Sequence, residues 1–119
     1  MTNYGFMRVA AAIPKMQVGN IDFNVVEIKK LALEASKNAA VVISFPELCL
    51  TGYTLGDLLH QELMLQKSLE ALEDLQKFSI NISSIICVGF PLALEDKLFN
   101  VAALIGNGQV LGIVPKTYI

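Results

Sequence analysis

A charge-free run of mostly β-branched residues, 41–45, constrains the possible folds most strongly. It ends at Pro46, and Glu47 follows at once. An apolar run of this length without alternation is typical of a parallel strand that is covered on both faces. Proline has no amide hydrogen to give to a sheet, so it marks the end of the strand. A chain built around such a strand needs helices to cover the sheet.

Two helical stripes flank this run. Apolar residues recur three or four positions apart between residues 21 and 39, which predicts a helix with one buried side. Asn24 and Glu27 have the spacing of a capping box. Leucines at near-helical spacing predict a second helix from about residue 58 to Phe78, with Asp57 as its candidate N-cap.

Short apolar runs make up most of the remaining chain. Residues 8–13 predict a first strand, and three more strands are predicted over residues 85–90, 98–105 and 110–114. The Asn-Gly pair before the last run is a strong hairpin signal. The order β-α-β-α-β-β-β predicts an α/β fold with parallel strands first and hairpins last. No linker or repeat divides residues 1–119, so we expect no internal domain boundary.

The composition excludes several classes of protein. The chain has a net charge of −2 and no basic cluster, so no nucleic-acid partner is expected. The uncharged stretches 78–94 and 98–114 contain polar residues and turns, and neither predicts a membrane span. The first residues lack the long apolar region of a signal peptide, so none is predicted.

Two cysteines and one histidine are too few for a common metal motif. Cys49 and Cys87 have no CxxC partner, and His60 stands alone, so no metal site is expected. Both cysteines lie among apolar residues. We interpret them as reduced thiols of a cytoplasmic protein that pack in the interior.

Charged residues of opposite sign follow two predicted strands. Glu47 follows residues 41–45 and Pro46, and Lys116 follows residues 110–114 and Pro115. The carboxyl ends of parallel strands are where open α/β sheets place their sites. A buried carboxylate has a raised pKa and becomes a better base near neutral pH, unless a cation such as Lys116 opposes the shift. The spacing alone leaves three possibilities: a catalytic pair, a structural ion pair, or two loop charges that do not meet. Tyr53 is equally open between packing and a hydroxyl in a pocket.

The segments FPELCLTGY, residues 45–53, and PKTYI, residues 115–119, resemble the nitrilase superfamily of carbon–nitrogen hydrolases. The resemblance implies an α-β-β-α sandwich, of which these residues form a partial domain that stops before the strand of the nucleophile. It also implies that Glu47 is the general base, that Lys116 stabilises the tetrahedral intermediate, and that a nucleophilic cysteine comes later. Neither cysteine of this chain matches that position, so the 119 residues alone are expected to be inactive. Tyr53 is the candidate substrate-binding residue.

The segments YGFMRVAAAIPK and LTGYTLGDLLHQ are similar to the glutaminase domains of the glutamine-dependent NAD synthetase family. This resemblance implies hydrolysis of glutamine to supply ammonia for the ATP-dependent amidation of deamido-NAD. ATP and magnesium are then expected at a separate synthetase domain, no cofactor within these residues, and a homo-oligomer. Two alternatives remain: another amidase or carbamoylase of the superfamily, and a non-catalytic assembly module.

Overall fold

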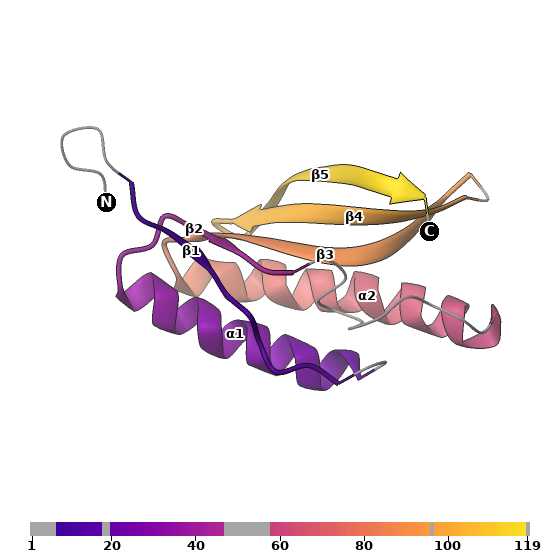
Figure 1. Ribbon diagram of the computed structural model, residues 1–119, viewed down its shortest axis with the longest axis horizontal. Coiled ribbons are helices and arrows are strands. Elements are labelled where there is room, and N and C mark those ends of the chain that lie inside the picture. The colour runs from indigo at the N-terminus through magenta and orange to yellow at the C-terminus, as the bar shows by residue number, and fades with distance from the viewer. Residues whose placement is uncertain (1–6, 18–19, 47–57, 96, 119) are drawn as a thin grey trace.

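The computed structural model describes residues 7–17, 20–46, 58–95 and 97–118, with only the backbone for 58–61 and 116–118. Within these residues a five-stranded sheet carries two helices on one face (Figure 1). The strands are β1 (Val9–Ala11), β2 (Val42–Ser44), β3 (Ile85–Leu94), β4 (Lys97–Gly106) and β5 (Gln109–Tyr118). The helices are α1 (Ile21–Lys37) and α2 (Leu58–Phe78), and the 3₁₀ turn η1 (Ser79–Asn81) follows α2.

The strands lie across the sheet in chain order. β1, β2 and β3 are parallel, whereas β4 is antiparallel to β3 and β5 is antiparallel to β4. The predicted α/β order, with parallel strands first and hairpins last, is confirmed. Because two antiparallel steps separate β5 from β3, β5 runs in the same direction as β2. The hairpin of β3 and β4 lies between these two strands.

The N-terminus of α1 is capped four residues earlier than the sequence predicts. Asn20 Oδ1 accepts a 3.1 Å hydrogen bond from the amide nitrogen of Phe23, which satisfies one free donor of the first turn. Asn24 lies inside the helix and is fully buried. Its Oδ1 accepts from Gln17 N at 2.8 Å, and its Nδ2 donates to Gln17 O at 3.0 Å. The predicted capping box is therefore wrong, and Asn24 instead fastens the preceding loop to the helix.

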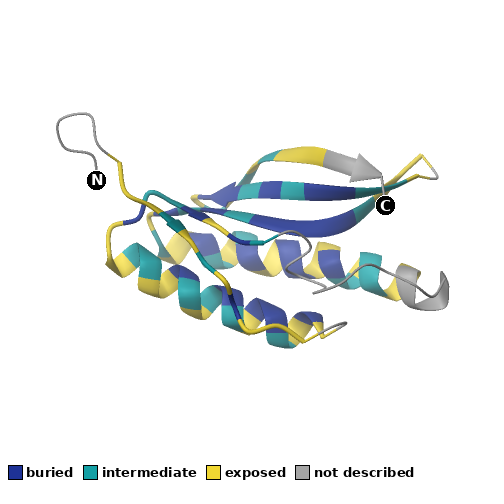
Figure 2. Cartoon of the chain, viewed as in Figure 1, coloured by how far each residue is buried: buried dark blue, intermediate teal, exposed yellow. Residues whose placement is uncertain are grey.

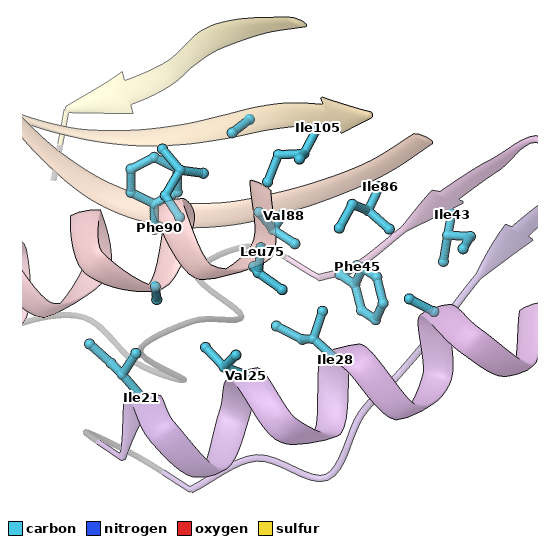
Figure 3. Packing of buried hydrophobic residues seen from close by; sticks show 14 of the residues in the cluster. Ile21, Val25, Ile28, Ile43, Phe45, Leu75, Ile86, Val88, Phe90 and Ile105 are labelled. Carbon is cyan, nitrogen blue, oxygen red and sulfur yellow. The ribbon is translucent and has the colours of Figure 1, made fainter. Parts of the chain in front are cut away.

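The hydrophobic core fills the space between the sheet and the helices (Figure 3). Ile43, Val88 and Phe90 reach it from the sheet, Ile28 from α1 and Leu75 from α2, all fully buried. Burial of these side chains is the main driving force for packing both helices on the sheet. Figure 2 shows the buried positions gathered where the helices and the central strands face one another.

The opposite face of the sheet carries no helix in the described part of the chain. On β2, Ile43 is buried against the helices, but Ser44 on this helix-free face is exposed. The prediction that residues 41–45 are covered on both faces is therefore wrong for the described structure, because both helices pack on one side. Among the described residues, no helix is long and apolar enough to cross a membrane.

Candidate active site at one edge of the sheet

The structure locates one of the three predicted site residues. Glu47 and Tyr53 lie outside the described residues, whose second range ends at Pro46. Lys116 lies in β5, where the backbone is described.

β2 and β5 run in the same direction, so their C-terminal ends lie at the same edge of the sheet, the edge that the strand ends form. Ser44, Cys87, Leu104 and Gly112 form one row across the four strands. Lys116 lies four residues beyond Gly112, in the direction in which Glu47 follows Ser44. Neighbouring strands are about 4.8 Å apart, so three spacings separate the β2 and β5 backbones by about 14 Å. The fold thus brings position 116 to the edge at which β2 ends, with two strands between them.

Lys116 occupies a break in the pairing of β4 and β5. Asn100 pairs with Thr117 and Val101 pairs with Pro115, so Lys116 has no partner residue on β4. Such a β-bulge bends the strand and redirects side chains, and bulges are over-represented next to active sites. The sequence predicted that Lys116 follows its strand, which is wrong. β5 continues to Tyr118 because β4 extends far enough to pair with it.

A small hollow lies directly at the end of β2. Its volume is about 60 Å³, and Ser44, Pro46, Cys87, Gly89 and Ala102 are among the residues that line it. The amide nitrogen of Phe45 donates a 3.0 Å hydrogen bond to Cys87 O, which holds the end of β2 against β3. Pockets that bind small molecules measure about 300–1,000 Å³, so this hollow is far too small to hold an amino acid. One of its lining residues, Pro46, directly precedes Glu47 in the sequence.

Neither sulfur chemistry nor metal binding stands out among the described residues. Cys87 is a free, half-buried thiol on the helix-free face. Cys49 lies outside the described residues. In the described part of the chain, His, Cys, Asp and Glu form no group of three that could hold a metal ion.

Asn100 is a buried polar residue beside the bulge that the sequence interpretation did not single out. It lies in β4 beside the bulge, it is only 5% exposed, and its Oδ1 has no hydrogen-bond partner in the described structure. The available signal was a single amide side chain within the apolar run 98–105. A single polar residue in an apolar run can be interpreted only when its neighbours on the adjacent strands are known.

Residues 8–119 match the family described as carbon-nitrogen hydrolase. The chain therefore belongs to the carbon–nitrogen hydrolase family, as the FPE segment and the later lysine predicted. It is 33% identical over 115 residues to the glutamine-dependent NAD(+) synthetase of Mycobacterium leprae. That match covers 97% of this chain and 17% of the relative, so the chain spans about a sixth of the relative's length.

Solved structures show the same fold. A glutamine-dependent NAD(+) synthetase from Cytophaga hutchinsonii superimposes with a TM-score of 0.81 at 25% identity, over 95% of this chain and 19% of that one. An amidase from Nesterenkonia sp. has a TM-score of 0.80 at 20% identity, over 92% of this chain and 42% of that one. The predicted nitrilase-like fold is thereby confirmed.

Proposed function

We propose that this chain forms part of the glutamine amidohydrolase site of a glutamine-dependent NAD(+) synthetase. The observation that carries the proposal is the 33% identity to the Mycobacterium leprae enzyme over 97% of the chain. The sheet topology is compatible with it, because β2 and β5 lead toward the same edge and carry position 116 there.

Glu47 is the proposed general base, and Lys116 the proposed oxyanion stabiliser. Glu47 takes the proton of a cysteine thiol that neither Cys49 nor Cys87 supplies, and the thiolate attacks the side-chain amide carbon of glutamine. Lys116 stabilises the negative oxygen of the tetrahedral intermediate. Glu47 returns the proton to the departing nitrogen, ammonia leaves and a thioester remains. Water then attacks with Glu47 again as base, and glutamate is released. Tyr53 is the proposed contact to the substrate.

The ammonia then serves the ATP-dependent amidation of deamido-NAD. ATP with magnesium, and deamido-NAD, are the proposed ligands of a synthetase domain outside these residues. A cytoplasmic homo-oligomer is the proposed form of the whole protein.

Substitution of Glu47 in the full-length protein tests the proposal. Formation of NAD is measured with glutamine and, separately, with an ammonium salt as nitrogen source. Loss of a general base lowers a rate by about 10²–10⁴-fold, so Glu47→Gln should abolish most glutamine-supported turnover and leave ammonia-supported turnover unchanged. Glu34→Gln, at an exposed position of α1, is the matched control and should leave both rates unchanged. Normal glutamine-supported turnover in Glu47→Gln would contradict the proposal.

The two alternatives give different results in the same assay. An amidase without synthetase activity hydrolyses an amide but forms no NAD from ammonia. A non-catalytic assembly module does neither, and Glu47→Gln then changes no rate. The likeness to the Nesterenkonia amidase shows the shared fold and does not favour the first alternative.

A further inference from the structure

The last residues of β2 are held by a neighbouring strand on each side. The amide nitrogen of Ala12 donates a 2.9 Å hydrogen bond to Ser44 O, and the amide nitrogen of Phe45 donates a 3.0 Å hydrogen bond to Cys87 O. The backbone up to Phe45 therefore cannot shift without breaking a hydrogen bond to β1 or to β3.

Phe45 also fixes this point through its side chain. The residue is 7% exposed and belongs to the hydrophobic core. Figure 3 shows its ring pointing from the end of β2 toward α1, on the side of Ile28. A buried aromatic ring resists displacement, because moving it would expose apolar surface and open a void in a close-packed interior. The end of β2 is thus anchored in the core as well as in the sheet.

Pro46 makes the next link of the chain stiff. The proline ring locks its own φ near about −65° and restricts the preceding residue, Phe45, to extended conformations. Pro46 is half-buried and lines the hollow at the end of β2 together with Cys87 and Gly89. Glu47 is the next residue along the chain, and two residues span at most about 7 Å. Since ψ of Phe45 and φ of Pro46 are both restricted, ψ of Pro46 is the free backbone dihedral between the α-carbons of Phe45 and Glu47.

We propose that Phe45 and Pro46 are positioning residues, which together set the place of the Glu47 carboxylate relative to the other reacting groups. Phe45 supplies the fixed point, and Pro46 passes it to the next residue with little backbone freedom. A general base acts only within hydrogen-bond reach of the proton that it takes, and a misplacement of about 1 Å can slow a reaction about 100-fold. This role rests on the proposed function, in which Glu47 is the base.

Substitutions of Pro46 in the full-length protein test the stiff link. Pro46→Ala releases φ at this position, and Pro46→Gly releases it further, because glycine also adopts positive φ readily. Glutamine-supported kcat should fall about tenfold or more in Pro46→Gly and by less in Pro46→Ala. The KM for glutamine should change less than about twofold, and ammonia-supported turnover should stay normal. Equal kcat values in the unsubstituted protein and both variants would overturn the proposal.

A double-mutant cycle shows whether Pro46 acts through Glu47. Once Glu47→Gln has removed the base, Pro46 has no carboxylate to position. Adding Pro46→Gly to Glu47→Gln should therefore lower the residual glutamine-supported rate by less than about twofold. A purely structural role predicts the same loss in both backgrounds, and that result would overturn the proposal.

Phe45→Leu tests the anchor, with Leu75→Ala as the control for lost core packing. Leucine keeps an apolar side chain in the core but not the shape of the ring, so glutamine-supported kcat should fall while KM and ammonia-supported turnover stay normal. Leu75 is equally a core residue, near the end of α2 that leads into β3, and Leu75→Ala should leave kcat within about twofold of normal. Equal losses of kcat in both variants would overturn the role of Phe45, because general instability would then explain them.

Glu47→Gln alone separates this inference from the proposed function. If Glu47→Gln abolishes glutamine-supported turnover and Pro46→Gly does not lower it, the positioning role is rejected and the proposed function is retained. If Glu47→Gln changes no rate, Glu47 is not the base, and both are rejected.

Discussion

The amide nitrogen of Gly108, in the turn between β4 and β5, donates a 2.8 Å hydrogen bond to the hydroxyl oxygen of Ser79 in η1. Ser79 in turn donates to Gln76 O at 2.7 Å, and Gln76 Nε2 donates to Gly108 O at 3.1 Å. The hairpin turn is thus fastened to the end of α2. β5, which carries position 116, starts from a fixed point.

Gly108→Ala should destabilise the protein through the backbone of this turn. Asn107 and Gly108 both have positive φ, 53° and 77°, as a tight hairpin turn requires. A Cβ at Gly108 would lie 2.9 Å from Ile80 Cγ1 as well. We expect the free energy of unfolding to fall by about 1–2 kcal/mol, measured by denaturant titration. Gly112→Ala is the control, because no atom lies within 4 Å of its added Cβ, and an equal loss there would contradict the explanation.

Asn24→Asp should be destabilising at neutral pH. Asn24 Nδ2 donates to Gln17 O, and a carboxylate would place an acceptor there instead, in a fully buried position. We expect a loss of about 2–4 kcal/mol, which shrinks in acid because a protonated carboxyl group can donate to Gln17 O. Asn20→Asp is the matched control, since aspartate is an equally good N-cap. Similar losses for both variants, or no effect of pH, would argue against this role.

Leu75→Ala should leave a cavity beneath the sheet. Leu75 is fully buried in the core between α2 and the strands. Loss of its side chain should cost about 2–5 kcal/mol of stability in thermal or denaturant unfolding. Leu69 on the same helix is 48% exposed, and Leu69→Ala should cost less than about 1 kcal/mol. Comparable losses would mean that α2 packs differently on the sheet.

The 119-residue polypeptide, expressed by itself, should self-associate. Apolar side chains are exposed on it, with Val9 65% and Val114 54% accessible. β1 and β5 also form the two edges of the described sheet, and unpaired edges favour association. Sedimentation should show concentration-dependent species, and Val9→Lys with Val114→Lys should reduce them. A monomer that is unaffected by concentration would refute this expectation.

Cys87→Ala in the full-length protein should retain glutamine-supported turnover. Cys87 is half-buried and lines a hollow that is too small for glutamine. The proposed nucleophile is a different cysteine, so kcat should change less than about twofold in a steady-state assay. Cys49→Ala is the companion variant with the same expectation. Abolished turnover in either one would reassign the nucleophile to this chain.

Regular elements were predictable where one local pattern determined them. The leucine stripe predicted α2 at both of its ends, and Asn-Gly predicted the hairpin between β4 and β5. Strand ends were not predictable, because they depend on neighbouring strands. The predicted strand over residues 85–90 ends before Pro91, yet β3 continues to Leu94. The described part of β2 ends opposite Cys87, so Pro91 lies beyond the stretch of β3 with which β2 pairs.

The candidate site shows the same limit. Resemblance of two short segments identified Glu47 and Lys116 as candidates, but local sequence did not show that position 116 is a bulge. The bulge depends on the register between Asn100 and Thr117. That Asn100 is buried opposite Pro91 is likewise a property of two paired strands and not of one.

The hairpin of β3 and β4 lies between β2 and β5 and fixes their register relative to each other. Its register is continuous from Ile86 opposite Ile105 to Leu94 opposite Lys97. A slip of one residue would move β5 by about 3.4 Å relative to Pro46 and would turn each of its side chains to the other face. Insertions in this hairpin should therefore impair the proposed site even when every proposed catalytic residue is intact.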